Sequence, residues 1–535
     1  MIPFESDGTF RADTKTHGVR RAAVRGAGVT ILASGLSFAV QMGATVTLAR
    51  LLMPADFGVV TMVTTFSLLL SSFGLNGFTE VILQREDVTH YLASNLFWIN
   101  LGAGAVLTIV FAALGHPLAH FYHDPLVAQV VRGMSLTILV ASFSVIHLAL
   151  LNRATRFTAV SANVVVARVV CVIVSIALAL GGWGYWALVA GNLALQLSTA
   201  VGAWLMCRWI PGRPRSVPGT GVCLRFAVHV YARFSFNYFS GNTDNLLVGW
   251  RFGAGSLGLY KKAFDLFFIP VCQLLSPMSA VAITTLSRFN NNRAQYQRYF
   301  LSGLSVLALL GMGIGADFTL IGGDLIRLIL GPNWGESGRI FAFFGPGIGV
   351  MLLYNTHGWI HLSIGRPDRW FRWAVIEFLC TAGLFLIMLP WGPRGIALAW
   401  AVSFFVLMFP AFWYAGKPIG FGVAPILAVV WKFFVASVAA GGSTAWLIHF
   451  APRLAAAPGA LASFERLISV STIFFSLYLV GVAVLHRGIE PLRQAASLVH
   501  DLRPQRTASV EMEGIRPDAA LPAASDNIRD LAEVK

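Results

Sequence analysis

The sequence predicts an all-α membrane protein with about fourteen transmembrane helices. Hydrophobic residues make up 56% of the 535 residues and charged residues only 12%, whereas soluble proteins carry about a quarter charged residues. Apolar runs of about 20 residues, enough to cross a ~30 Å hydrocarbon layer, recur from Val29 to Leu485. The runs lack the short alternating pattern of barrel strands, and a helix satisfies its own backbone hydrogen bonds in lipid.

The predicted helices follow one another with short polar breaks, and residues 1–27 before them are basic. No apolar core of a signal peptide lies within residues 1–27, so we expect the first helix to be retained. The helices are expected to begin near Val29, Phe57, Leu92, Val127, Thr158, Gly184, Phe226, Leu259, Phe300, Ile340, Phe371, Gly395, Ala424 and Ile468.

Lysine and arginine are enriched in cytoplasmic loops, so their positions predict the orientation. They recur in alternate loops, which predicts a cytoplasmic N-terminus; these loops hold Arg85, then Arg153 and Arg156, then Arg208, Arg213 and Arg215, then Arg288, Arg293 and Arg298, then Arg366, Arg369 and Arg372. The seventh turn breaks the alternation, with Arg251, Lys261 and Lys262 on the predicted outer side.

Several function classes are disfavoured by the sequence. The formal net charge of +15 reports this topology and not nucleic-acid binding, because no basic soluble domain is visible. Five cysteines without CxxC spacing argue against a disulfide framework or a zinc site. Phosphate-binding glycine motifs are absent, so we expect no ATPase. Enzymatic activity and a bound cofactor are not expected either.

The polar stretches divide the chain. A proline- and glycine-rich basic stretch near its centre reads as a linker after six helices, and the region after His486 lacks the composition of a membrane helix. The predicted segments are a basic cytoplasmic N-terminal segment (1–27), helices one to six (28–210), a cytoplasmic linker (211–225), helices seven to twelve (226–416), two further helices (417–486) and a cytoplasmic tail (487–535).

An internal repeat relates the two groups of six helices. The segment Leu48–Gly58 ends the first helix and begins the second, and Val248–Gly258, offset by 200 positions, is placed in the same way between the seventh and eighth. The two segments share few identical residues, so their sequence similarity taken by itself could also arise by chance. The shared placement predicts two halves of the same orientation, related by an axis along the membrane normal.

Ionisable residues inside a membrane are costly and tend to face a cavity or a partner. In the predicted seventh helix Arg233, Asn237, Ser240 and Asp244 fall at i, i+4, i+7 and i+11, within about 60° on one face. The first helix carries a milder stripe that includes Gln41. The stripes either line a wet cleft, with Arg233 on a phosphate, or merely pack helices against one another.

Further charged candidates lie along the chain. Arg168 and Arg132 are candidates for holding an anionic head group, or for reaching the membrane interface instead. Asp244 and Asp265 are candidates for a coupling cation, H⁺ or Na⁺, although Asp265 with Lys261 also fits a structural i, i+4 pair. Glu80 and Glu377 are weaker candidates.

Two histidine groups could suggest metal binding. His116, His120 and His123 are close together, and His357 and His361 have i, i+4 spacing, but neither group forms an HExxH motif. We interpret the first as an exposed outer turn and the second as a polar face of the tenth helix, and expect no metal.

Five segments resemble the polysaccharide transporter family. They are Leu48–Gly58, Gln84–Asp87, Gly241–Gly249, Leu257–Tyr260 and Ser287–Arg288, which cover the first 300 residues or so, while the later helices match mainly in number and spacing. The subgroup resembled is the Wzx-like repeat-unit flippases of the multidrug/oligosaccharidyl-lipid/polysaccharide exporter superfamily.

The resemblance implies two six-helix lobes around a central cleft, two additional C-terminal helices, and alternating access. It implies translocation of undecaprenyl-diphosphate-linked oligosaccharide repeat units from the cytoplasmic to the periplasmic leaflet, for exopolysaccharide or lipopolysaccharide synthesis. It also implies a polysaccharide polymerase and chain-length proteins as partners beside the lipid bilayer.

Three alternatives stay open. A multidrug cation antiporter of the same superfamily would favour acidic and aromatic cavity residues, which Arg233 argues against. A membrane enzyme, a polymerase or ligase acting on the same lipid carrier, would be expected to carry a substantial outer loop, and the predicted outer turns are short. A scaffold without transport is the third.

Overall fold

A computed structural model describes residues 3–5, 7–10, 16–85, 87–215, 220–290, 292–450 and 460–493. Within these ranges a few side chains, that of Arg233 among them, lie outside the description. The helices are α1 (Thr16–Leu51), α2 (Pro54–Gln84), α3 (His90–Ala113), α4 (Gly115–Tyr122), α5 (Leu126–Ser142), α6 (Val145–Arg153), α7 (Phe157–Leu180), α8 (Tyr185–Cys207), α9 (Thr220–Ser240), α10 (Thr243–Arg288), α11 (Arg293–Leu330), η1 (Pro332–Trp334), α12 (Gly335–Asn355), α13 (His357–Ser363), α14 (Pro367–Met388), η2 (Leu389–Trp391), α15 (Gly392–Gly416), η3 (Lys417–Ile419), α16 (Ala424–Phe450) and α17 (Ala460–His486).

The predicted all-α membrane class is confirmed. Eleven stretches of the described residues are long and apolar enough to cross a membrane. One of them, Pro367–Ile419, holds both α14 and α15. Neither α9 nor α10 is among the eleven stretches, and these two helices carry the polar stripe and the lysines. The count of fourteen stays a prediction.

The predicted seventh and eighth helices divide differently from the expectation. The chain turns at Gly241 and Asn242, between α9 and α10, in the middle of the predicted seventh helix. The backbone then leaves helical geometry again at Gly253, where φ is 76° and ψ is −179°. A left-handed φ of this kind suits glycine because it has no Cβ. In addition, α9 begins at Thr220, so the last part of the predicted linker 211–225 is helical.

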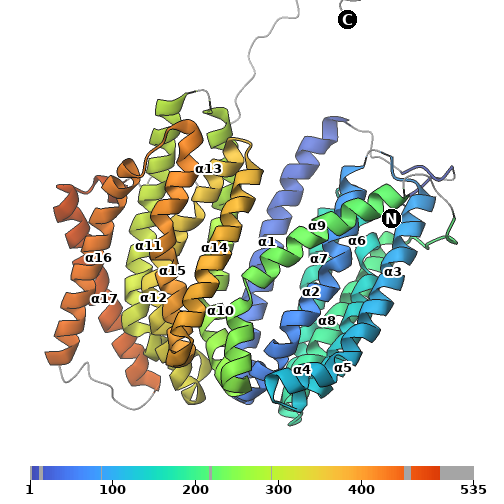
Figure 1. The fold of residues 1–535 in the computed structure, drawn as a ribbon, viewed down its shortest axis with the longest axis horizontal. Coiled ribbons are helices and arrows are strands. Elements are labelled where there is room, and N and C mark those ends of the chain that lie inside the picture. The colour runs from blue at the N-terminus through green and yellow to red at the C-terminus, as the bar shows by residue number, and fades with distance from the viewer. Residues whose placement is uncertain are drawn as a thin grey trace, which may run out of the picture. The chain divides into compact units, whose positions relative to one another are not determined.

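Helices α1–α8, here called the first half, pack mainly on one another, and α10–α17, the second half, do the same (Figure 1). Helix α9 runs obliquely across the first half toward α10 in Figure 1. Its Tyr231 donates a hydrogen bond to the Leu69 carbonyl of α2 at 2.9 Å, and the Phe236 and Phe371 rings of α9 and α14 have centroids 5.7 Å apart. Helix α9 thus contacts both halves.

The two segments of the predicted repeat contact each other. A Cβ added to Gly58 on α2 would lie 1.7 Å from the Ala254 carbonyl oxygen, and a Cβ added to Gly258 on α10 would lie 1.8 Å from the Pro54 oxygen. Gly58 and Gly258 are equivalent in the repeat, as are Pro54 and Ala254. The contact is therefore reciprocal, as two-fold-related segments require. We call these four residues the glycine joint.

Side chains next to the glycine joint extend the contact between the halves. The Trp334 indole donates a hydrogen bond to the Ala49 carbonyl at 2.8 Å, and its ring lies 5.5 Å from that of Phe57. The guanidinium of Arg50 donates to the Leu328 carbonyl at 2.9 Å. Both hydrogen bonds satisfy carbonyls near helix ends, which lack partners within their own helix.

The first part of the predicted linker is attached to the first half. Asn95 of α3 exchanges two hydrogen bonds with the Arg215 backbone, at 2.6 and 3.0 Å, and Trp98 donates to the Gly212 carbonyl at 2.8 Å. Trp209 is 5% exposed and belongs to the same apolar core as Phe4, which precedes α1. Residues 208–215 therefore form part of the first half.

Replacement of either joint glycine by alanine should destabilise the protein. An added methyl group at Gly58 or Gly258 meets a backbone oxygen, and overpacking of this kind costs about 1–3 kcal/mol. Gly43→Ala is the matched control, because a Cβ at Gly43 meets nothing within 4 Å and alanine favours a helix. Thermal unfolding in detergent measures all three; equal midpoints would contradict the close contact.

Candidate functional site

The largest group of predicted site residues meets at one cavity. Asn237, Ser240 and Asp244 line a space of about 360 Å³ together with Glu377, a weaker candidate from the sequence. Its described walls come from α9, α10 and α12–α15. The stripe that we expected to face a cleft between two lobes therefore lines a cavity beside α9 in the second half.

The break between α9 and α10 places Asp244 in the first turn of α10. A negative side chain there is stabilised by the unpaired N–H groups and the positive end of the helix dipole. Tyr260 donates a hydrogen bond to Asp244 Oδ2 at 2.8 Å, and Oδ1 is buried with no partner among the described residues. One carboxylate oxygen thus stays available for a cation or a proton.

The break also corrects the periodicity argument. Arg233, Asn237, Ser240 and Asp244 were placed on one face of a continuous helix, but the helix ends after Ser240 and restarts at Thr243. The Asn242 side chain donates to the Tyr238 carbonyl at 2.9 Å, which satisfies one of the backbone groups that the break frees. Discontinuous helices of this type form ligand sites in many transporters.

Aromatic rings form much of the cavity lining, which also holds the carboxylates of Asp244 and Glu377. The rings belong to Phe264, Phe268, Tyr354, Trp370, Phe371, Phe378, Phe385, Trp400 and Phe404. Among the side chains that the structure describes, none of those lining the cavity belongs to lysine or arginine. Two carboxylates beside aromatic faces favour a cation and disfavour a phosphate.

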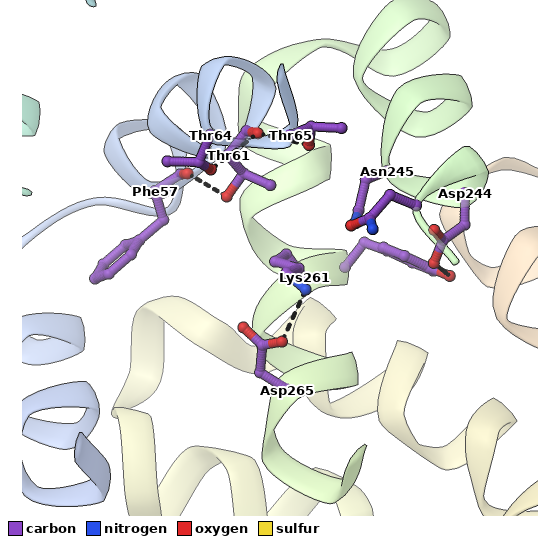
Figure 2. Close-up of polar contacts among 10 residues, drawn as sticks. Phe57, Thr61, Thr64, Thr65, Asp244, Asn245, Lys261 and Asp265 are labelled. Carbon is purple, nitrogen blue, oxygen red and sulfur yellow. Dashed lines mark hydrogen bonds and ion pairs between the residues drawn. The ribbon is translucent and has the colours of Figure 1, made fainter. Parts of the chain in front are cut away.

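Lys261 and Lys262 lie inside α10 and not in a loop. They follow the break at Gly253 by eight and nine residues, which is about 12 Å along a helix. Lys261 Nζ lies 2.9 Å from Asp265 (Figure 2), and Lys262 Nζ lies 4.2 Å from the Phe57 ring centroid. The structural reading of Lys261 and Asp265 as an i, i+4 pair is confirmed.

The structure does not bring the other predicted residues to the cavity lining. Gln41 is half-buried on α1 and Arg168 half-buried on α7, where its Nε has no described partner. Arg132 is exposed on α5 and donates to the Ala128 carbonyl of its own helix at 3.3 Å. Arg233 lies on α9, but its side chain is outside the described residues.

Helix packing accounts for part of the first-helix stripe. Thr30 of α1 receives a hydrogen bond from Ser161 of α7 at 3.4 Å. This contact supports the alternative that small polar side chains pack neighbouring helices.

The two histidine groups have different surroundings. His116, His120 and His123 are exposed on α4 and its C-cap, as expected for an outer turn. His357 and His361 were expected on a polar face, but they are 3% and 0% exposed. Neighbouring aromatic side chains of other helices cover them, which the spacing within one helix does not reveal.

Reasoning from the sequence also missed the positions of the lysines. Lys261 and Lys262 were assigned to an outer turn because the predicted eighth helix began near Leu259. Gly253, eight residues after the polar run that ends at Asn245 and six before Leu259, was the available signal for an earlier helix start.

These features define a polytopic membrane protein built like a transporter, with a broken helix beside a cavity that holds buried ionisable groups. The family model of the polysaccharide biosynthesis proteins matches residues 47–339. The chain belongs to this family.

Curated relatives share about a fifth of their residues with the chain. The teichuronic acid biosynthesis protein TuaB of Bacillus subtilis is 22% identical over 380 residues, which are 68% of this chain and 76% of the relative. The succinoglycan biosynthesis transport protein ExoT of Rhizobium meliloti is 21% identical, over 68% and 74%. The lipopolysaccharide biosynthesis protein WzxC of Escherichia coli is 21% identical, over 59% and 65%.

Two solved structures share the fold. The lipid II flippase MurJ in an inward closed conformation has a TM-score of 0.68 at 13% identity, over 86% of this chain and 98% of that one. A multidrug resistance transporter of the MATE family in an inward-facing conformation has a TM-score of 0.60 at 12% identity, over 72% and 94%.

A double-mutant cycle should detect the ion pair of α10. We expect Lys261→Met and Asp265→Asn to be coupled by about 0.5–3 kcal/mol, because partly buried partners in contact are not additive. Unfolding of the wild type, both single variants and the double variant in detergent gives the coupling. The pair Arg339 and Glu336, which is more exposed, should give less; additive effects at Lys261 and Asp265 would contradict the pair.

Proposed function

We propose that this protein is a flippase for lipid-linked sugars. It moves undecaprenyl-diphosphate-linked oligosaccharide repeat units from the cytoplasmic to the periplasmic leaflet of a bacterial inner membrane, for exopolysaccharide or lipopolysaccharide synthesis. The observation that carries the proposal is membership of the polysaccharide biosynthesis family by a chain with a transporter fold. Relatives named for teichuronic acid, succinoglycan and lipopolysaccharide biosynthesis support it.

The physical problem of such a reaction lies in the head group. The lipid tail stays in the hydrocarbon, while a diphosphate and its sugar need a polar path through it. Lys261 is paired with Asp265 and also interacts electrostatically with Asp244, whereas the ammonium group of Lys262 lies over the Phe57 ring of α2. We infer that the positive charge of Lys262 and of its neighbour Lys261, beside α2, attracts the diphosphate.

The orientation also belongs to the proposal. With Lys261 and Lys262 inside a helix, they no longer count as outer-loop charges, and Arg251 remains as the exception in the seventh turn. The N-terminus then lies in the cytoplasm and the glycine joint at the periplasmic end. Alternating access requires that this joint opens when the substrate leaves.

Energy for transport is proposed to come from a cation gradient. Asp244 and Glu377 line the same cavity, and one Asp244 oxygen has no described partner. Asp265 is less suited, because Lys261 already neutralises it. H⁺ and Na⁺ both fit a site of carboxylate, amide and hydroxyl oxygens. The coupling ion would bind in the second half, apart from the anionic substrate.

We also propose that transport is the only activity of this protein. The protein performs no covalent chemistry and hands repeat units to a separate polysaccharide polymerase and chain-length proteins. Purified protein incubated with lipid-linked repeat units should leave their covalent structure unchanged.

Deletion of the gene should leave lipid-linked repeat units on the cytoplasmic leaflet and stop polymer formation.

The double variant Lys261→Ala, Lys262→Ala should lower polymer yield about tenfold or more, since a charge-assisted hydrogen bond contributes about 1.5–3 kcal/mol. Lys417→Ala, at the exposed η3, is the control. Extraction of the lipid pool and assay of polymer check both; a deletion strain with normal lipid and polymer would refute flipping.

Asp244→Asn should uncouple transport from the ion gradient. The amide keeps the shape and the Tyr260 contact but cannot carry the negative charge that holds a cation. Reconstituted wild-type protein should move substrate faster under a pH or sodium gradient, and the variant should not respond to either. Asp87→Asn, on an exposed loop, should behave as wild type. Indifference of the wild type to both gradients would exclude coupling.

The cavity lining favours one second candidate function. Carboxylates beside aromatic rings suit an organic cation, as a multidrug antiporter would require. Ethidium efflux from cells that express the protein tests this candidate. Efflux that is lost in Asp244→Asn, with normal polymer synthesis in the deletion strain, would favour antiport over flipping.

A further inference from the structure

Two buried histidines of α13 lie between the cavity and an exposed turn. His357 lines the cavity, and His361 follows one helical turn later, about 5.4 Å along the axis. Their ring centroids are 5.9 Å apart. After His361, α13 ends at Ser363 and residues 365–368 of the α13–α14 turn are exposed. The two buried rings thus occupy the part of α13 between the cavity and the exposed turn.

The hydrogen bond of His357 fixes its tautomer. His357 Nδ1 lies 2.6 Å from the Tyr354 carbonyl oxygen. A carbonyl only accepts, so Nδ1 carries the hydrogen, and Nε2 of the neutral ring is a free base. Tyr354 is itself held in place, because Trp373 donates to its hydroxyl at 2.8 Å. His357 therefore presents a fixed proton acceptor at Nε2.

Three of the four ring nitrogens have no partner among the described residues: Nε2 of His357 and both nitrogens of His361. A buried polar group without a partner costs about 1–3 kcal/mol. Apolar side chains at both positions would avoid this cost. Two imidazoles without such bonds on successive turns therefore require a functional reason.

Charged groups of both signs surround the pair. Arg369 of α14 lies over the Tyr414 ring of α15 at 4.2 Å, and the same ring packs on His361 at 5.8 Å. A nearby guanidinium disfavours a standing imidazolium. The other charged or titratable groups around α13 are Asp244 of α10, Asp368 and Glu377 of α14, and Tyr296 of α11, which hydrogen-bonds with Ser363 at 2.7 Å.

We propose that His357 and His361 relay protons between the α13–α14 turn and the carboxylates of Asp244 and Glu377. The inference rests on the proposed ion-coupled transport and names the coupling ion as a proton, since imidazole nitrogens carry H⁺ in a relay and carboxylate oxygens alone do not distinguish it from Na⁺.

Each step of the relay moves one proton and no electrons. His361 takes a proton from the turn on one ring nitrogen and releases one from the other nitrogen. His357 accepts it at Nε2 while Nδ1–H stays on the Tyr354 carbonyl, and then passes the same Nε2 proton to a cavity carboxylate. Transfer between the rings runs directly or through one water.

Reconstituted protein tests the relay. The probe is undecaprenyl diphosphate N-acetylglucosamine with a fluorescent sugar, and its transfer is followed with and without a gradient of about one pH unit. The acceleration is the ratio of the transfer rates with and without the gradient, and we expect His357→Gln and His361→Gln to lower it about tenfold or more. His116→Gln, exposed on α4, keeps the wild-type response.

Two outcomes contradict the relay: full acceleration in both glutamine variants, or acceleration by a sodium gradient with none by a pH gradient. Glutamine keeps one donor and one acceptor, and His361→Asn is a second variant if His361→Gln does not fold. If the wild type moves no probe, the proposed function fails instead of the relay.

Deuterium exchange at the imidazole C2 position then tests the histidines without any transport. The pH dependence of exchange at His361 and His357 should change in the Asp244→Asn, Glu377→Gln double variant, while exchange at His116 stays the same. Unchanged exchange at both buried histidines would overturn the relay.

Discussion

The two halves of the chain meet backbone to backbone at the glycine joint, and the rest of the interface depends on that approach. A methyl group at Gly58 or Gly258 would overlap a carbonyl oxygen of the opposite segment, so only glycine allows α2 and α10 to come this close. In lipid, where the hydrophobic effect between helices is absent, close packing of small residues supplies much of the association. The indole of Trp334, the guanidinium of Arg50 and the ammonium of Lys262 all contact the opposite half beside this point.

Charge is distributed unequally around α10. The carboxylate of Asp244 lies at its start and lines a cavity rich in aromatic rings. Two turns beyond the Gly253 break, Lys261 pairs with Asp265 (Figure 2) and Lys262 contacts the Phe57 ring of α2. In the proposed mechanism the anionic substrate and the coupling cation would bind at different positions on one helix. A shift of α10 would move both places together, which is a direct physical way to link the binding of one to the release of the other.

Most of the fold could be predicted from the sequence, because hydrocarbon leaves helices as the main choice and each run of apolar residues marks one. The repeat of Leu48–Gly58 located the glycine joint, and Asn237, Ser240 and Asp244 do gather at one cavity. The break at Gly241 and Asn242 was missed, since neither residue excludes a helix and the deciding hydrogen bonds are local to the folded chain. Burial of His357 and His361 by α14 and α15 depends on tertiary packing, which spacing within one helix cannot report.

The attachment of residues 208–215 to α3 has a consequence for biosynthesis. Side chains of α3 and α6 hydrogen-bond to the backbone of Trp209, Gly212 and Arg215. These hydrogen bonds use only residues of the first half. Chains emerge from the ribosome at about 5–20 residues per second, and N-terminal units generally fold first. The hydrogen bonds that attach residues 208–215 to α3 and α6 can therefore form while α10 is still being translated. The second half would then insert beside a first half that has already folded.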